Sequence, residues 1–197
     1  MTFPIYFKAD YPAIDIMKLK RCFIATELPL EIIEEIKKIQ KLIETKHLFK
    51  GKSTKTDNLH LTLKFLGHID ESKVDQVRQK LREIDFERFE GELGDIGVFS
   101  KNNIRIIWIE IIGGVFELQK SIDEKLSNLF NLENRFMSHI TIARVKQVND
   151  KRKLIENLEN MRYKKIKFSI DSFYLMESEL RPRGPIYKKI EKYRLKS

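Results

Sequence analysis

Two short stretches of the chain share one pattern of apolar and polar positions. Residues 60–63 read His-Leu-Thr-Leu and residues 139–142 read His-Ile-Thr-Ile, so a polar residue alternates with a large aliphatic one in both. Alternation with a period of two predicts a half-buried β-strand. Because side chains two apart on a strand point to the same face, each strand should present one imidazole and one hydroxyl together, with its aliphatic residues turned into a core.

Similar elements are predicted around each of these stretches. The first half reads as a strand at 21–26, a helix from Pro29 to about 45, a polar loop at 50–57, the histidine strand ending at Gly67, a helix capped by Asp70 and a strand near 91–99. The second half reads as a strand at 104–112, a break at 113–114, a helix over 115–129, the second histidine strand, a helix capped by Asp150 over 154–161, and strands at 166–176 and 185–193 joined by a turn at 180–184.

The order strand, helix, histidine strand, helix, strand therefore occurs twice. This duplication predicts an α+β fold of two pseudo-twofold-related lobes, each an antiparallel sheet with helices on its outer face, and an active-site cleft between them. We expect residues 17–197 to form this single bilobal domain. Residues 1–16 contain two prolines and no clear period, and we interpret them as an N-terminal extension, either from an upstream start codon or added artificially.

Composition narrows the class of protein. The chain has 197 residues, of which 42% are hydrophobic and 34% charged, which is typical of a soluble globular protein. No apolar run approaches the roughly 20 residues that span a bilayer. The single cysteine, Cys22, excludes an intrachain disulfide and a cysteine-rich zinc site, and its apolar strand predicts an inert core thiol. We expect a cytoplasmic monomer.

The formal net charge of +9 indicates an anionic partner. Excess lysine and arginine concentrates polyanions near a protein surface, which favours RNA, DNA or phosphorylated ligands. A lysine-rich surface is also typical of proteins from warm habitats, so charge alone leaves both interpretations open.

Two imidazoles facing one cleft suit phosphodiester cleavage. In-line attack at phosphorus needs a base on the attacking side and an acid on the leaving side, and histidine can serve as either near neutral pH. Thr62 and Thr141, beside His60 and His139, can donate hydrogen bonds to the non-bridging oxygens. This scheme requires no metal and no cofactor, and the residues alone leave open which histidine is the acid.

Other catalytic chemistries lack their motifs in this sequence. There is no His-Glu-x-x-His helix, no Gly-x-Ser-x-Gly elbow and no phosphate-binding loop of the Gly-x-x-x-x-Gly-Lys type. Ser138 precedes His139 directly, so on a strand it should point to the opposite face. His47 and His68 follow a helix end and a turn glycine, and we expect both to face solvent.

At these residues the chain resembles the 2H phosphoesterases, and within them the RNA 2′,3′-cyclic phosphodiesterases, historically called 2′-5′ RNA ligases. The resemblance covers about residues 17–195. Its segments are Arg-Cys-Phe-Ile-Ala at 21–25, Asn-Leu-His-Leu-Thr-Leu-Lys-Phe-Leu-Gly at 58–67, Gly-Val-Phe at 97–99, Arg-Ile-Ile-Trp at 105–108, His-Ile-Thr-Ile-Ala-Arg-Val-Lys at 139–146, and Leu175, Ser178, Leu180 and Gly-Pro-Ile-Tyr at 184–187. Ser138 departs from the family, which commonly has proline there.

The resemblance implies hydrolysis of RNA 2′,3′-cyclic phosphate ends, such as those of tRNA fragments, to 2′-phosphates. It implies that His60 donates a proton to the departing 3′ oxygen and that His139 accepts one from water. It also implies a weak reverse reaction that joins a cyclic phosphate to a 5′-hydroxyl. Two other functions stay open from the residues: an RNA-end or tRNA-fragment binding module without turnover, and a 2H enzyme that acts mainly as a 2′-5′ ligase or on small cyclic nucleotides.

Several further residues are candidates for RNA or phosphate contacts. Arg144 and Lys146 carry positive charge, but on strict alternation both point away from the face of His139. Basic residues in loops could flank the cleft or simply be solvated, and Tyr187 could stack on a base or pack in its hairpin. The loop residues are Arg181 and Arg183 in the closing turn and Lys50, Lys52 and Lys55 in the first loop.

Overall fold

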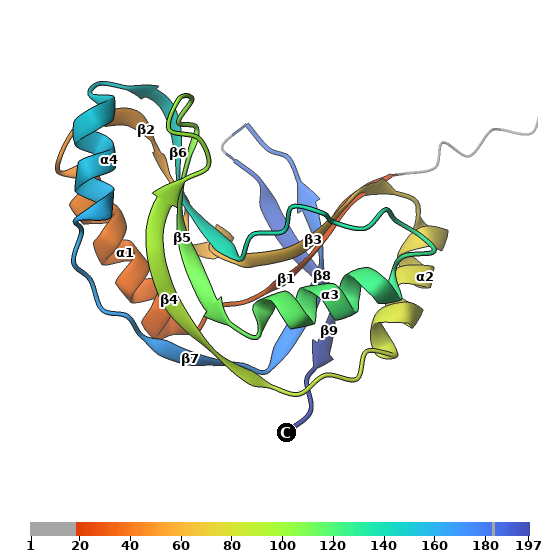
Figure 1. Ribbon diagram of the computed structural model, residues 1–197. Helices are drawn as coiled ribbons and strands as arrows, with labels where there is room; N and C mark the ends of the chain where they lie inside the picture. The colour runs from red at the N-terminus through yellow and green to blue at the C-terminus, as the bar shows by residue number, and fades with distance from the viewer. Residues whose placement is uncertain (1–18, 183) are drawn as a thin grey trace, which may run out of the picture.

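Two antiparallel sheets form the framework of the computed structural model, which describes residues 19–182 and 184–197 (Figure 1). The elements are, in chain order, β1 (Lys20–Thr26), α1 (Leu30–Glu44), β2 (Phe49–Ser53), the 3₁₀ turn η1 (Thr56–Asn58), β3 (Leu61–Ile69), α2 (Glu71–Arg82), β4 (Phe89–Val98), β5 (Ile106–Gly113), α3 (Val115–Lys125), β6 (His139–Val148), α4 (Lys151–Glu159), β7 (Lys167–Ile170), β8 (Ser172–Glu179) and β9 (Ile186–Arg194). The extension expected at 1–16 lies outside the described residues, so that prediction and the single domain over 17–197 stay predictions.

The two sheets have the same strand order apart from one added strand. One sheet runs β3-β1-β8-β9 and the other β2-β6-β5-β4-β7. The histidine strands β3 and β6 therefore hold equivalent positions, each beside the opening strand of its half. The predicted α+β duplication is confirmed. Among the described strands, β2 alone has no counterpart, and it breaks the symmetry by pairing with β6.

The prediction of a polar loop at 50–57 was wrong for its first residues, which form β2. This strand lies at the edge of its sheet, so most of its side chains are solvated and its sequence lacks an apolar face. Gly51 permits the pairing, because a Cβ atom there would lie 2.3 Å from the carbonyl oxygen of Arg144. A glycine between two lysines is typical of a turn, which is why the sequence pattern pointed to a loop.

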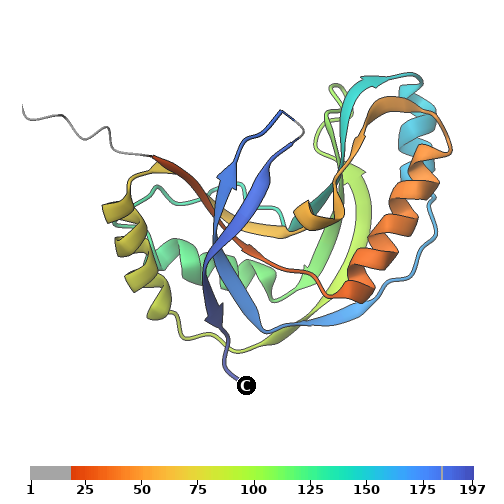
Figure 2. The same ribbon diagram turned by 180° about the vertical axis from the view of Figure 1, so that it is seen from behind.

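Each sheet carries two helices on its outer face (Figures 1 and 2). Helices α1 and α4 pack on the five-stranded sheet, and α2 and α3 lie against the four-stranded one. Helix α1 follows β1 of the four-stranded sheet but packs against β6, and α3 follows β5 of the five-stranded sheet but packs chiefly against β3. Each histidine strand is thus covered by a helix from the other half of the chain.

Both predicted helix caps are present. The side chain of Asp70 accepts a hydrogen bond of 2.8 Å from the backbone N–H of Lys73, and that of Asp150 accepts one of 3.0 Å from the N–H of Lys153. These bonds satisfy amide groups that the first helical turn leaves without partners. Asp70 and Asp150 each follow a histidine strand, so the two halves start these helices in the same way.

The closing strands differ from the prediction. Residues 166–176 were expected to form one strand, but Asp171 separates β7, in the five-stranded sheet, from β8, in the four-stranded one. The chain thus crosses between the sheets at this point. The apolar sides of both sheets and the four helices of the described residues contribute to one continuous core. No helix in the described ranges is long and apolar enough to span a membrane.

Candidate active site

A cleft of about 430 Å³ lies where the two histidine strands meet. It is lined by His60, which directly precedes β3, and by His139, the first residue of β6, together with Thr62 and Thr141. The aliphatic residues between them, Leu61 and Ile140, are fully buried on the other side of their strands. The structure therefore brings together the four side chains that the sequence pattern assigned to one cleft, and its volume is that of a small-molecule site.

Both imidazole rings are held by the same local hydrogen bond. Nδ1 of His60 lies 2.8 Å from the carbonyl oxygen of Asn58, and Nδ1 of His139 lies 2.7 Å from that of Met137. A carbonyl oxygen only accepts, so Nδ1 carries the proton in each ring. The Nε2 atom of each ring is then the nitrogen available to a substrate.

Aromatic rings meet the edge or face of each imidazole. Tyr187 packs against His60 with ring centroids 5.0 Å apart and an interplanar angle of 85°, and Phe99 packs against His139 at 4.9 Å and 89°. Phe23 lies on another side of His60, at 5.1 Å. These contacts fix the ring positions and remove water from around them.

Burial lowers the pKa of both histidines below its ordinary value. For His60, the hydrogen bond to Asn58 opposes this effect, while the charge that His139 carries when protonated and the positive charge of Arg144 add to it. For His139, the hydrogen bond to Met137 is the opposing influence. Both imidazoles of the free protein are consequently neutral near pH 7, and the negative charge of a bound phosphate is what would raise the pKa of one of them.

Both histidine strands contain a β-bulge at the residue that follows the threonine. On β3, Thr62 and Lys64 face consecutive residues of β1, so Leu63 has no partner opposite it. On β6, Thr141 and Ala143 face consecutive residues of β5, so Ile142 is likewise unpaired. An extra residue reverses the alternation beyond it.

The two bulges turn equivalent residues into the cleft. Phe65 and Arg144 each lie five positions after a histidine, and both line the cleft. The expectation that Arg144 points away from the side of His139 was therefore wrong, because it assumed strict alternation. Phe65 was not recognised as a cleft residue for the same reason.

Buried polar side chains anchor the two bulged segments. On the β6 side, Nε2 of Gln40, from α1, donates hydrogen bonds to the carbonyl oxygens of Ile142 at 2.8 Å and Thr54 at 2.9 Å. On the β3 side, the ammonium group of Lys64 forms an ion pair with Asp123, from α3. Both helices reach across from the other half of the chain, so the exchange of helices fixes the shape of the cleft.

The other candidates for RNA or phosphate contacts divide between the cleft and its surroundings. Tyr187, Lys52 and Lys55 line the cleft, whereas Lys50 does not. Lys146 is exposed outside it. Arg181 forms an ion pair of 2.6 Å with Glu179, and neither of the two lines the cleft. Arg183 lies outside the described residues.

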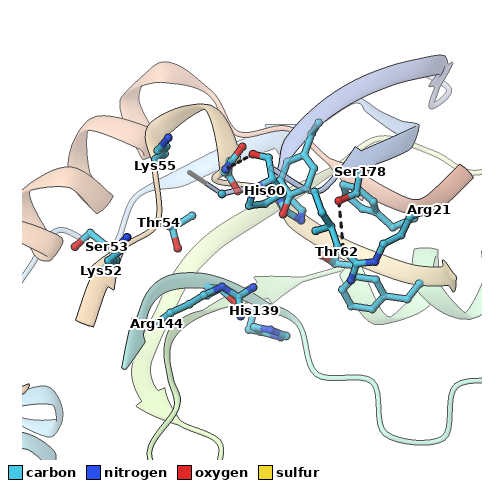
Figure 3. A pocket seen from close by; sticks show the side chains of 18 residues that line it. Arg21, Lys52, Ser53, Thr54, Lys55, His60, Thr62, His139, Arg144 and Ser178 are labelled. Atoms are coloured by element: carbon cyan, nitrogen blue, oxygen red, sulfur yellow. Dashed lines mark hydrogen bonds between the residues drawn. The ribbon is translucent and has the colours of Figure 1, made fainter. Parts of the chain in front are cut away.

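Further lining residues were missed by the sequence pattern. Arg21 projects from β1 and its guanidinium group donates a hydrogen bond of 3.2 Å to the hydroxyl of Ser178 on β8. Figure 3 shows these two residues on one side of the cleft, with Lys52, Ser53, Thr54 and Lys55 gathered on the other. Asn58 joins η1 to the closing hairpin through a hydrogen bond of 3.0 Å to the carbonyl oxygen of Pro185. Such contacts depend on strand pairing across the whole chain, which no local spacing reveals.

Ser138 and the remaining histidines behave as expected. The hydroxyl of Ser138 donates a hydrogen bond of 2.6 Å to the carbonyl oxygen of Ile111 and does not line the cleft. His47 and His68 are exposed. In the ranges 19–182 and 184–197, no group of three or more His, Cys, Asp or Glu side chains is arranged to hold a metal ion.

A comparison with protein families identifies the class to which this cleft belongs. The model described as "LigT like Phosphoesterase" matches residues 27–108 and 110–187, and each matched segment contains one of the two His-x-Thr motifs. The chain belongs to the LigT-like phosphoesterase family. The resemblance to the 2H phosphoesterases is thereby confirmed, and so is the prediction of an enzyme of this class.

Curated relatives of this LigT-like phosphoesterase carry a common name. A protein of Methanocaldococcus jannaschii named "RNA 2′,3′-cyclic phosphodiesterase" is 37% identical over 179 residues, which cover 88% of this chain and 99% of that protein. A protein of Thermotoga maritima with the same name is 36% identical over 175 residues, covering 83% of this chain and 91% of the relative.

Solved structures share the fold of this LigT-like phosphoesterase. The crystal structure of the Thermus thermophilus protein TT0787 superimposes with a TM-score of 0.75 and 24% identity, over 89% of this chain and 97% of that one. The crystal structure of E. coli LigT complexed with 3′-AMP gives a TM-score of 0.71 and 22% identity, over 91% and 99% of the two chains. The bilobal α+β architecture is therefore shared with both of these solved structures.

Proposed function

We propose that this protein hydrolyses 2′,3′-cyclic phosphate ends of RNA to 2′-phosphates by general acid–base catalysis with His60 and His139. The observation that carries the proposal is the pair of imidazoles in one cleft, each with Nδ1 bound to a backbone carbonyl and Nε2 left for the substrate. The curated relatives named RNA 2′,3′-cyclic phosphodiesterase support the substrate class.

In the proposed reaction, water attacks phosphorus opposite the 3′ oxygen. His139 accepts the water proton at Nε2 as the new P–O bond forms, and His60 donates a proton from Nε2 to the 3′ oxygen as the P–O3′ bond breaks. The opposite assignment of the two roles obeys the same chemistry, and the resemblance to the 2H phosphoesterases favours the one given. Each proton transfer accelerates the reaction by roughly 10²–10⁴-fold.

The proton donor must be charged before it can act. Burial lowers the pKa of both imidazoles, so the free protein holds them neutral. The cyclic phosphate is an anion, and its arrival between the rings would raise the pKa of the donor and favour its protonation. Thr62 and Thr141 then donate hydrogen bonds to the non-bridging oxygens, which gain charge in the transition state.

The same residues can also catalyse ligation to a 5′-hydroxyl, with His139 again accepting the proton of the nucleophile and His60 again donating one to the 3′ oxygen. A 5′-hydroxyl would replace water and yield a 2′-5′ linkage. The scheme uses no metal ion and no cofactor. We further propose that the protein acts as a cytoplasmic monomer on RNA fragments with cyclic ends, including tRNA fragments.

Product analysis tests this function. The protein is incubated in EDTA with a short oligoribonucleotide that ends in a 2′,3′-cyclic phosphate, and the products are separated against 2′- and 3′-phosphate standards. We expect only the 2′-phosphate, with one ¹⁸O atom incorporated from labelled water. A His47→Ala preparation should behave like the unmodified protein, because His47 is exposed and lies outside the cleft lining.

Two results would contradict the proposal. Exclusive formation of the 3′-phosphate would mean that the P–O2′ bond breaks instead. Binding of the cyclic-ended RNA without any product, in a preparation shown to be folded, would favour an RNA-end binding module.

A further inference from the structure

The two ends of the cleft differ in chemistry although they are built in the same way. Phe65 and Arg144 occupy equivalent positions, each five residues after a histidine and each turned into the cleft by a bulge. One is an aromatic ring and the other a cation. An RNA end has two corresponding parts, a base and a phosphate, so this difference bears on how the substrate proposed above would lie.

Three cations gather at the Arg144 end. Lys52 of β2 and Arg144 of β6 are direct cross-strand partners, and Lys55 follows shortly after β2 (Figure 3). Within residues 19–182 and 184–197, no Asp or Glu lies within ion-pair distance of these three side chains. Like charges directly opposite each other destabilise a sheet. A bound anion between them would remove that repulsion.

This end is held in place by buried hydrogen bonds. Gln40, which is 8% exposed, binds the carbonyl oxygens of Thr54 and Ile142, and the backbone N–H of Thr54 donates a bond of 2.9 Å to Ile142. The segment that carries Lys52 and Lys55 is therefore tied to the bulge that turns Arg144 inward. In addition, β2 is the one described strand without a counterpart in the other sheet, so its lysine, Lys52, has no equivalent at the other end of the cleft.

The Phe65 end offers flat surfaces. The ring of Phe65 is 68% exposed and lies 6.2 Å from that of Phe23, its partner on β1. Arg21, two residues before Phe23 on β1, lines the same cleft, and its guanidinium group is positioned by Ser178. Aromatic rings and arginine planes are the surfaces on which proteins stack unpaired bases.

The structure of a terminal nucleotide matches this division. In a 2′,3′-cyclic nucleotide the base is attached next to the 2′ carbon, and the link to the preceding phosphate leaves beyond the 3′ carbon. The base and the preceding phosphate therefore extend from opposite sides of the cyclic phosphate. We propose that the cleft holds RNA in one direction, with the phosphate that precedes the terminal nucleotide on Lys52, Lys55 and Arg144 and the terminal base against Phe65.

This inference rests on the proposed function and can be tested separately from it with three substrates. The first is adenosine 2′,3′-cyclic phosphate. The second is a dinucleotide with this same end and one preceding phosphodiester, and the third is that dinucleotide with a neutral methylphosphonate in place of the phosphodiester. We expect kcat/KM to be about tenfold higher for the charged dinucleotide than for the mononucleotide, since charged contacts to a phosphate contribute at this scale. The methylphosphonate dinucleotide should lack most of this increase in kcat/KM. Added salt should reduce the increase seen with the charged dinucleotide.

Substitutions at Lys52, Lys55 and Phe65 distinguish the ends. Lys52→Gln should reduce the dinucleotide-to-mononucleotide ratio of kcat/KM by about three- to tenfold, and Lys55→Gln should act in the same direction. Phe65→Ala should lower kcat/KM for both substrates by about 10- to 100-fold and leave their ratio unchanged, because both contain the terminal base. Lys50→Gln is the matched control, since Lys50 lies on the same strand outside the cleft lining.

The outcomes separate the two proposals. If the unmodified protein hydrolyses none of the three substrates, the proposed function fails. If it hydrolyses all three, but kcat/KM is about the same for the charged dinucleotide and the mononucleotide, the directional binding is overturned and the function stands. The same conclusion follows if Lys50→Gln and Lys52→Gln change the dinucleotide-to-mononucleotide ratio of kcat/KM equally. A Phe65→Ala variant that is folded and fully active would likewise overturn the assignment of the base.

Discussion

The side-chain amide of Gln40 donates a hydrogen bond of 2.8 Å to the carbonyl oxygen of Ile142, the unpaired residue of the β6 bulge. Gln40 comes from the first half of the chain and Ile142 from the second. The bond therefore connects a helix of one half to the point in the other half where the alternation of side chains reverses. The inward position of Arg144 depends on that reversal.

Replacing Gln40 by leucine should destabilise the protein by about 1–3 kcal/mol. The substitution removes the side-chain donor from the carbonyl oxygen of Thr54, in a part-buried bond, and from that of Ile142, in a buried one, and lost hydrogen bonds of this kind are costly. Urea unfolding measures the change. Lys41→Ala, at the exposed neighbouring position, should change the free energy of unfolding by less than about 0.5 kcal/mol. Equal stability of the two variants would mean that the Gln40 bonds contribute nothing.

Removing one member of the Lys64–Asp123 ion pair should destabilise the protein more than the replacement of Gln40. Both side chains are buried, and Lys64→Met would leave the carboxylate of Asp123 without its countercharge, at about 3–5 kcal/mol. In the double variant Lys64→Met/Asp123→Leu no unpaired charge remains. Its loss of unfolding free energy should therefore be smaller than the sum of the losses in the two single variants. A double-mutant cycle by urea unfolding checks this, and strict additivity would show that the two charges do not interact.

Alanine at His60 or His139 should lower kcat for a cyclic-ended RNA by about 10²–10⁴-fold. Because the two imidazoles act as one acid–base pair, the double variant should be little slower than the worse single variant. His68→Ala, at an exposed histidine, is the matched control and should retain full activity. Losses that multiply in the double variant would indicate that the histidines act independently.

The buried histidines should also make stability depend on pH. The fold lowers the pKa of both, so the unfolded chain binds more protons once the pH falls below the ordinary histidine value of about 6.5. Their effect on stability is absent above that pH, and stability is lost as the pH falls from there through the folded pKa values. The free energy of unfolding, measured with urea, should fall less between pH about 7.5 and about 5 for His60→Ala/His139→Ala than for the unmodified protein. An identical loss would mean that neither imidazole is desolvated.

Local signals made part of this fold predictable. The histidine strands were visible because one side of each is buried, which requires a large aliphatic residue at alternate positions. The helix caps Asp70 and Asp150 could be predicted because aspartate is a preferred residue directly before a helix, and each precedes apolar residues at helical spacing. The duplication followed from these local patterns, and with it the meeting of His60 and His139 in one cleft.

The missed features depend on pairing between distant segments. β2 has no apolar face because it lies at a sheet edge, and Gly51 suggests a turn unless the nearby carbonyl oxygen of Arg144 is known. The bulges exist because β3 and β6 place an extra residue, Leu63 and Ile142 respectively, against the strand they face. Arg21 enters the site only because β1 lies between β3 and β8.

The exchange of α1 and α3 between the sheets makes the halves mutually dependent. A fragment that ended between β4 and β5 would leave β3 uncovered, since α3 would be missing, and its own α1 would have no sheet to cover. Two such fragments would therefore have to associate in order to bury their apolar faces. The duplicated chain achieves within one molecule what a pair of separate, interlocked half-size subunits would otherwise need to assemble.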